Sequence, residues 1–150
     1  MAEHTYSTHL VWQGSTGEGY RAYRREHRAV APPAGTTVAL SADRAFRGDP
    51  AFLNPEQLLV MAASSCQLLA FLAVAARAGV DVLDYEDEAS GFIDDGSPPA
   101  RISTITLAPV IRVAPGTDPA VVHKLVEQAH EECYIANSLN SEVTVEATVL

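Results

Sequence analysis

The stretch NPEQLLVMAASSCQLLAFLAVAARAGV, residues 54–80, decides the fold of this chain. It contains no charged residue from Gln57 to Ala76, a run long enough to cross a bilayer. The run is also rich in alanine and carries polar side chains near its middle, from Ser64 to Gln67. Polar groups at the centre of a membrane are costly unless they are paired. We therefore expect a helix at the core of a water-soluble protein rather than a membrane span.

The sequence also marks both ends of this helix. Asn54 is a favourable N-cap, Pro55 suits the first helical position, and Gln57 completes a capping-box pattern. Gly79 is a typical stop, so we expect the helix to cover residues 54–79. A helix that is apolar on all sides must be enclosed on all sides. Small residues along it permit close contact, which favours a homodimer in which the helix packs against its copy.

The composition indicates one acidic globular domain over residues 1–150, with 47% hydrophobic residues and a formal net charge of −9. An acidic surface repels nucleic-acid phosphates and anionic lipids, so we expect no nucleic-acid or membrane partner. Residues 1–10 lack the basic start and apolar run of a signal peptide, which predicts a cytoplasmic protein. In a reducing compartment the two cysteines are expected to be free thiols, metal ligands or redox partners.

Period-two alternation and turn residues outline the strands. They are expected at residues 4–13, 20–30 and 36–42 before the long helix, with a turn at 14–19, and at 81–94, 100–115 and 141–150 after it. A second helix is expected from Pro119, capped by Thr117 or Asp118, with an apolar face formed by Val122, Val126, Ala129 and Cys133. The order β-β-β-α-β-β-α-β predicts an α+β fold, with the strands in one six-stranded sheet.

The two cysteines are the candidates for chemistry. Cys66 lies near the middle of the long helix, where the helix dipole does little to activate a thiol. A thiol buried among apolar groups is inert, whereas a reactive thiolate needs a cation nearby. The loop before the helix offers Arg44 and Arg47 as that cation. Glu56, in the first helical turn, could hold such an arginine or simply complement the helix dipole.

Spacing limits how these groups can meet. Glu56 and Cys66 are about 15 Å apart along one helix, so they do not touch directly. Either a loop arginine bridges them, or groups of two chains meet across the dimer. Cys133 ends the second helix, and a disulfide with Cys66 requires that the two helices pack together.

A zinc site is an alternative, because His130, Glu132 and Cys133 together with Cys66 offer ligand atoms. The sequence has neither the CxxC nor the HExxH spacing of such sites, so we expect no metal and no other cofactor.

Two segments carry a family resemblance. NPEQLLVMAASSC, residues 54–66, resembles the hallmark of the OsmC/Ohr superfamily, the osmotically inducible protein C and organic hydroperoxide resistance proteins. In that hallmark a cysteine follows the glutamate by ten positions, as Cys66 follows Glu56. QAHEECYIANSL, residues 128–139, resembles the family's second-cysteine segment and contains Cys133.

The resemblance implies an OsmC-like fold, an intertwined homodimer and a thiol-dependent peroxidase that reduces organic hydroperoxides. By the family's roles, Cys66 would be the peroxidatic thiolate, Cys133 the resolving thiol, and Glu56 the residue that orients an arginine. An external dithiol would then reduce the disulfide. A dimeric OsmC-like protein that binds a small molecule without catalysis is the alternative.

Two positions differ from the family pattern. Tyr134 follows Cys133, where the family commonly has proline. The hydroperoxide-resistance branch carries its arginine in the first hairpin turn, and the turn GSTGEG, residues 14–19, has none. The arginine is therefore expected in DRAFRGDP, residues 43–50, with Arg47 preferred to Arg44.

Overall fold

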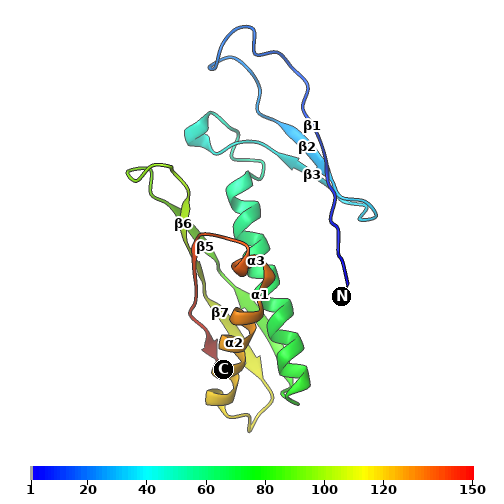
Figure 1. Cartoon of the computed structure of the whole chain (residues 1–150), viewed down its shortest axis with the longest axis vertical. Coiled ribbons are helices and arrows are strands. Elements are labelled where there is room, and N and C mark those ends of the chain that lie inside the picture. The colour runs from blue at the N-terminus through cyan, green and yellow to red at the C-terminus, as the bar shows by residue number, and fades with distance from the viewer. Residues whose placement is uncertain (1) are drawn as a thin grey trace. The chain divides into compact units, whose positions relative to one another are not determined.

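The computed structural model describes residues 2–150, and the chain forms two compact units (Figure 1). Unit 1 runs from Met1 to Leu58 and unit 2 from Leu59 to Leu150. The boundary lies within the long helix α1 (Pro55–Arg77), whose first turn belongs to unit 1. The expectation of one domain over residues 1–150 stays a prediction.

The order of elements confirms the α+β fold class. Unit 1 contains the strands β1 (His9–Val11), β2 (His27–Val30) and β3 (Thr37–Leu40) and the 3-10 helix η1 (Arg44–Phe46). After α1, unit 2 contains β4 (Val82–Asp87), β5 (Ser90–Ile93), β6 (Ile102–Leu107), β7 (Pro109–Val113), α2 (Pro119–Glu132), α3 (Tyr134–Asn137), β8 (Glu142–Val145) and β9 (Thr148–Val149). The order agrees with the prediction, except that each strand expected after α1 is divided in two and that α3 was not expected.

The strands of unit 1 form an antiparallel sheet in the order β1-β2-β3. The second strand begins at His27 and not at residue 20 as predicted, so residues 12–26 connect β1 to β2. Within this hairpin connection the Arg25 guanidinium donates hydrogen bonds to the carbonyl oxygens of Tyr20 and Tyr23. These bonds fold the segment onto itself, which is why it does not extend the sheet.

Both ends of α1 are formed as the sequence predicts. The Asn54 N–H donates to Gln57 Oε1 over 3.0 Å, and the Gln57 N–H donates to Asn54 Oδ1 over 2.9 Å. This reciprocal pair is the predicted capping box. At the other end Gly79 adopts a left-handed conformation with φ 73°, and the Val80 N–H donates to the Ala75 carbonyl oxygen over 2.9 Å.

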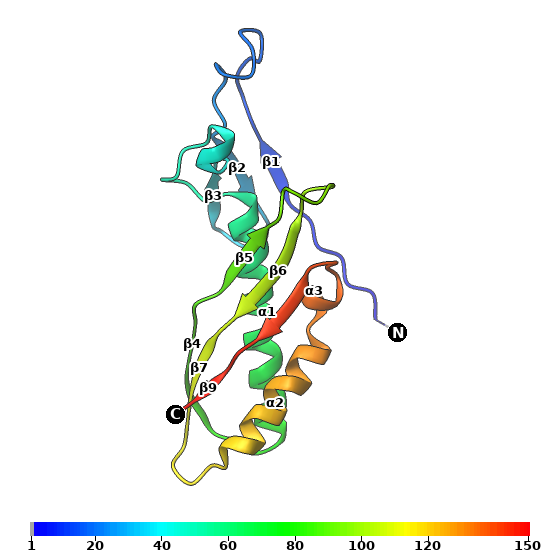
Figure 2. The ribbon, with the colours of Figure 1, turned by 90° about the vertical axis from the view of Figure 1, so that its left-hand side faces the viewer.

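The expected six-stranded sheet is wrong, because the strands of residues 2–150 form three separate three-stranded sheets. In unit 2 the two sheets have the strand orders β4-β7-β9 and β5-β6-β8. The chain passes from one sheet to the other between β4 and β5, between β6 and β7, and between β8 and β9 (Figure 2). The break lies where β6 ends and β7 begins at Pro109, which has no N–H to donate to a ladder. Next to it the Ala108 N–H donates to the Asp87 carboxylate over 2.7 Å instead of to a strand carbonyl.

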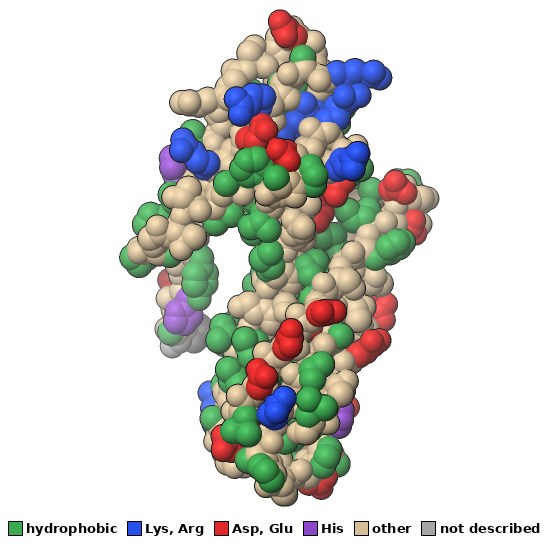
Figure 3. All heavy atoms as spheres, turned by 180° about the vertical axis from the view of Figure 1, so that it is seen from behind, with side chains coloured by type: hydrophobic (Ala, Val, Ile, Leu, Met, Phe, Trp, Pro, Cys, Tyr) green, Lys and Arg blue, Asp and Glu red, His purple; other side chains and the backbone are tan. Residues whose placement is uncertain are grey.

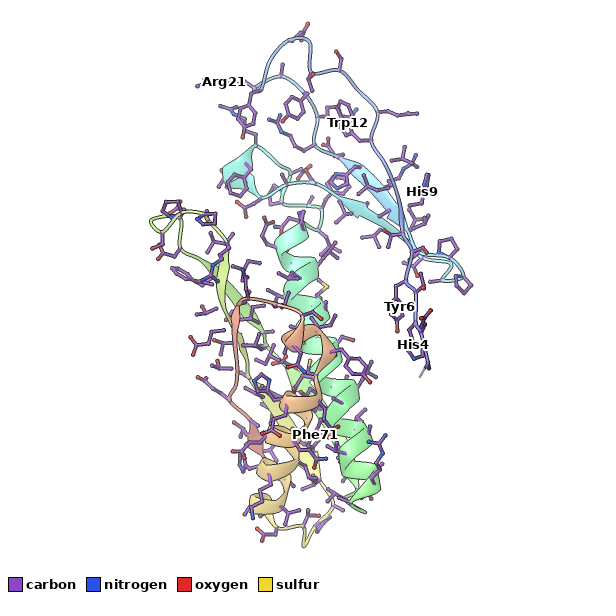
Figure 4. The ribbon with its side chains drawn as sticks, viewed as in Figure 1. His4, Tyr6, His9, Trp12, Arg21 and Phe71 are labelled. Carbon is purple, nitrogen blue, oxygen red and sulfur yellow. The ribbon has the colours of Figure 1, made fainter. Side chains whose placement is uncertain are left out.

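The main core of unit 2 lies between the strands and the two longer helices. It joins buried residues of α1 (Phe71, Val74, Ala75), β7 (Ile111, Val113) and α2 (Val122, Leu125, Val126, Ala129). Phe71 is fully buried, and its ring lies 5.8 Å from the Tyr85 ring between centroids (Figure 4). The predicted apolar face of α2 is therefore confirmed, and Asp118 is its N-cap, because its carboxylate accepts from the Ala120 N–H.

Only one stripe of α1 is buried in the described chain. Its length and mean hydropathy of 2.1 would also suit a membrane span, but five of its residues, including Gln67 and Phe71, belong to the interior. On other faces Met61, Leu69 and Leu72 remain exposed by 49%, 64% and 39%. The helix is thus a core helix, as predicted, whose enclosure is incomplete within one chain.

Candidate functional site

The fold of unit 2 brings the two cysteines together. Cys66 is half-buried on α1, and Cys133 is 1% exposed at the end of α2. Both are free thiols, and Cys66 lies close enough to Cys133 to raise the pKa of its thiol. Helices α1 and α2 pack together in the main core, which is the condition stated above for a disulfide between Cys66 and Cys133.

The surroundings of Cys133 keep its thiol protonated. Burial raises the pKa of the Cys133 thiol above its usual value, and the neighbouring sulfur of Cys66 adds to the rise. The backbone N–H groups of Ala136 and Ile135 act in the opposite direction. Tyr134, in the position where the family commonly has proline, is 82% exposed and starts the helical turn that brings these amides near. Cys66 is the more exposed of the two cysteine residues.

A half-buried tyrosine near the cysteines has a buried hydroxyl group. The Tyr85 hydroxyl has no hydrogen-bond partner among residues 2–150. Burial raises the pKa of the Tyr85 phenol above its usual range, and the Asp87 carboxylate and Cys133 add to the rise. The phenol therefore stays neutral at physiological pH.

Unit 2 also has a pocket of about 470 Å³ between α1 and β4. Its lining consists of Val60, Met61, Ser64, Ser65, Leu68, Tyr85, Asp87 and Ala89. The Ser64 hydroxyl donates to the Asp87 carboxylate, which ties the helix to the break between the sheets. The lining mixes apolar side chains with two serines and an aspartate, and Cys66 is not part of it.

Unit 1 brings Glu56 together with an arginine in a smaller pocket of about 160 Å³. The lining consists of Arg25, His27, Ser41, Ala42, Asp43, Phe46, Pro55 and Glu56. The two arginines expected from the sequence, Arg44 and Arg47, are exposed on and after η1 and do not line this pocket in the described chain. Their proposed role stays a prediction.

An aromatic clamp holds Arg25. Its guanidinium carbon lies 3.7 Å from the centroid of the Tyr23 ring and 4.8 Å from that of the Tyr20 ring. The Trp12 ring meets the Tyr23 ring edge-on, with 6.4 Å between their centroids, and Figure 4 shows Trp12 inside the hairpin connection. The Tyr20 ring also meets the Tyr23 ring edge-on, with 6.1 Å between their centroids. Cation–π contacts of this kind contribute about 0.5–2 kcal/mol each. Two of the five N–H groups of Arg25 bond to backbone carbonyls, which leaves three for other acceptors.

Sequence reasoning missed Arg25 and His27. The segment YRAYRREHR was interpreted as a solvated strand, but most of it belongs to the hairpin connection, residues 12–26. The missed signal was the cluster of tyrosines among arginines, a composition suited to cation–π stacking. The sequence placed the arginine in residues 43–50, because the expected turn at residues 14–19 has none, whereas the connection between β1 and β2 spans residues 12–26 and includes Arg25.

The charges divide sharply between the units. Unit 1 has six arginines and six acidic residues, whereas unit 2 has four basic and thirteen acidic residues. Figure 3 shows positive side chains gathered on unit 1 and acidic ones over unit 2. Within residues 2–150, no three histidine, cysteine, aspartate or glutamate side chains form a group that could hold a metal ion.

Solved structures share this fold over nearly the whole chain. An OsmC-like protein of unknown function from Vibrio cholerae is 29% identical, with a TM-score of 0.86 over 99% of this chain and 100% of that one. An organic hydroperoxide resistance protein OsmC from Legionella pneumophila is 20% identical, with a TM-score of 0.70 over 99% of this chain and 98% of that one. At 20% identity the second likeness shows the fold alone.

Sequence relatives lead to the same family. An organic hydroperoxide resistance protein from Xanthomonas axonopodis pv. citri is 31% identical over 129 residues, which cover 83% of this chain and 87% of that protein. YmaD, an uncharacterised protein from Bacillus subtilis, is 23% identical over 99% of this chain and 97% of its own length. The sequence model of the OsmC-like protein family matches residues 48–148, which include Glu56, Cys66 and Cys133. The chain therefore belongs to the OsmC-like protein family.

Proposed function

We propose that this protein is a thiol-dependent peroxidase that reduces organic hydroperoxides to alcohols. The family includes proteins named for organic hydroperoxide resistance, which supports a peroxide-resistance role at the level of the family. The observation that carries the proposal for this chain is the pair of free thiols, one half-buried at Cys66 and one buried beside it at Cys133.

The two thiols suit successive steps. The accessible Cys66 thiolate attacks the distal oxygen of ROOH, which gives a sulfenic acid on Cys66 and the alkoxide RO⁻, and a proton converts the alkoxide to ROH. The Cys133 thiol then displaces hydroxide from the sulfenic acid and loses its proton, which gives a disulfide and water. An external dithiol returns the disulfide to two thiols and is itself oxidised. Cys133 suits the second step because it stays protonated and shielded until then.

The Cys66 thiolate needs a positive charge, because mid-helix amides do not supply one. We propose Arg25, oriented with Glu56 in the unit 1 pocket, as the first candidate, and Arg47 as the second. The shared pocket and the three free N–H groups of Arg25 support this preference.

A homodimer is part of the proposal. The exposed apolar residues Met61, Leu69 and Leu72 of α1 support it, because a second copy of the helix would remove this surface from water. The cytoplasmic location expected from the sequence stays a prediction.

Titration of thiols separates catalysis from simple binding. One equivalent of tert-butyl hydroperoxide should remove both thiols of each reduced chain together, because the second step consumes the sulfenic acid that the first step forms. Thiols are counted with a chromogenic disulfide in denaturant, before and after the peroxide. A chain that keeps both thiols would instead support the noncatalytic binding protein, and loss of a single thiol would remove the resolving role of Cys133.

The choice between arginines is tested by two matched substitutions. Arg25→Lys keeps the charge but loses the planar fork, and we expect oxidation of Cys66 to slow about 10- to 100-fold, since hydrogen bonds to charged groups contribute about 1.5–3 kcal/mol. Arg47→Lys should change the rate by less than about twofold if Arg25 stabilises the thiolate. The rate is measured by stopped-flow under single-turnover conditions. The reverse pattern would assign the role to Arg47.

A further inference from the structure

We propose that the Tyr85 hydroxyl donates a hydrogen bond to the Cys133 sulfur when that sulfur leaves as a thiolate during reduction of the Cys66–Cys133 disulfide. This inference rests on the proposed peroxidase cycle and concerns its last stage, in which an external dithiol restores the two thiols. Tyr85, Cys66 and Cys133 all belong to unit 2, so the contacts that carry the inference lie within one compact unit.

Exposure decides which sulfur of the disulfide the reductant attacks. Cys66 is half-buried, whereas Cys133 is 1% exposed at the end of α2. The rate of thiol–disulfide exchange depends on access of the incoming thiolate to the sulfur that it attacks. We therefore expect the reductant to attack Cys66, which makes Cys133 the leaving sulfur.

The leaving sulfur needs stabilisation that the backbone supplies only in part. Burial raises the pKa of the Cys133 thiol, and a sulfur with a high thiol pKa leaves slowly. The backbone N–H groups of Ala136 and Ile135 act in the opposite direction, yet the pKa of this thiol stays above its usual value. A further hydrogen-bond donor beside this sulfur would therefore speed the step.

Tyr85 offers such a donor. Its hydroxyl is buried and has no hydrogen-bond partner within the described part of the chain, residues 2–150. A buried hydroxyl without a partner costs free energy, which favours a state that supplies an acceptor. Burial and the Asp87 carboxylate raise the pKa of the Tyr85 phenol, and Cys133 lies close enough to add to the rise. The phenol thus keeps its hydrogen beside a thiolate and can donate it in a hydrogen bond.

Packing in the core holds the Tyr85 ring in place. On the strand ladder Tyr85 pairs with Ile111 of β7, and its ring lies 5.8 Å from the Phe71 ring between centroids. Both of these neighbours are fully buried. A donor that is fixed before the reaction stabilises a developing charge without the cost of reorganising the site.

The reduction transfers two electrons from the dithiol to the disulfide. One thiolate of the reductant forms an S–S bond with Cys66, the Cys66–Cys133 bond breaks, and its electron pair stays on the Cys133 sulfur, which accepts the Tyr85 hydrogen bond. The second thiol of the reductant then displaces Cys66 as a thiolate and closes the oxidised reductant. The proton of that second thiol passes through solvent to Cys133, so Tyr85 ends the cycle protonated, as it began.

Opening of a chemically closed disulfide tests the role of Tyr85. Diamide closes the disulfide without any peroxide, and excess 2-mercaptoethanol at fixed pH then opens it. Tyr85→Phe keeps the ring but removes the hydroxyl, and we expect the opening to slow about 3- to 10-fold, because one hydrogen bond to a partly charged sulfur is lost. Tyr134→Phe makes the same change beside Cys133 at a side chain that is 82% exposed, and it should leave the rate unaltered.

Two further measurements separate this role from a structural one. When the opening is quenched with N-ethylmaleimide, peptide mapping should find 2-mercaptoethanol on Cys66 and maleimide on Cys133. In a Cys66→Ser background, where Cys133 is the single cysteine, Tyr85→Phe should raise the pKa of the Cys133 thiol by about one pH unit. A pH titration of the ¹³Cβ signal of labelled cysteine measures this pKa, and Tyr134→Phe should not change it.

Each other outcome has a stated meaning. An unchanged opening rate or an unchanged Cys133 pKa in Tyr85→Phe would overturn the inference, and so would 2-mercaptoethanol found on Cys133. Equal slowing by the two tyrosine substitutions, or failure of diamide to close the disulfide, would overturn it as well. If diamide closes the disulfide but tert-butyl hydroperoxide does not, the proposed peroxidase function alone fails, because the opening step is measured without peroxide.

Discussion

Replacing Cys66 with serine is expected to reduce hydroperoxide turnover to the uncatalysed background. The hydroxyl is nearly the same size as the thiol and sits in a half-buried position, so the fold should be retained. A serine oxygen is not ionised here and does not form a stable oxidised intermediate with a peroxide, so the first step has no nucleophile. Consumption of cumene hydroperoxide in the presence of a dithiol reductant provides the measurement.

Cys133→Ser is the matched control for this result. Without Cys133 the first oxidation should proceed, and the sulfenic acid on Cys66 should persist long enough to be trapped by dimedone and detected by mass spectrometry. In Cys66→Ser no adduct should form, because the buried Cys133 thiol is protonated. Undiminished peroxide consumption by Cys66→Ser would refute the proposed peroxidase mechanism.

Replacing Phe71 with alanine is expected to lower the free energy of unfolding by about 3–5 kcal/mol, the usual range for removing a buried phenylalanine ring. Phe71 is fully buried between α1, β7 and α2 and contacts the Tyr85 ring. Its removal leaves a cavity where the helix carrying Cys66 meets the helix that ends at Cys133. Urea unfolding followed by circular dichroism measures the change.

Phe92→Ala is the control, because it makes the same chemical change in β5 at a side chain that is 61% exposed. It should lower the free energy of unfolding by about 1 kcal/mol or less. Equal losses from the two substitutions would contradict the central position of Phe71 in the core.

Local signals made much of the helical structure predictable. The capping box of Asn54 and Gln57 and the stop at Gly79 formed as expected, because each uses hydrogen bonds between residues close in sequence. The apolar face of α2 was also predictable, since its period follows from helix geometry alone. These signals placed both cysteines on helices that pack together.

The strands were less predictable. The pattern of residues 100–115 gave one strand, but Pro109 and the Asp87 side chain interrupt the ladder where neighbouring strands meet. Asp87 is about twenty residues away along the chain, so its contact with the Ala108 N–H exists only in the folded state. Alternation of side chains reports which face a strand buries and does not report where its hydrogen bonds stop.

The sequence by itself determined the family, the long central helix and the spacing of Glu56, Cys66 and Cys133, because these depend on motifs and on local hydrogen bonding. Only the tertiary structure decided which arginine shares a pocket with Glu56. Arg25 reaches it because the hairpin connection folds back on its own tyrosines and brings a side chain 31 residues distant in sequence to the start of α1. Such long-range approaches are set by packing, and no local pattern encodes them.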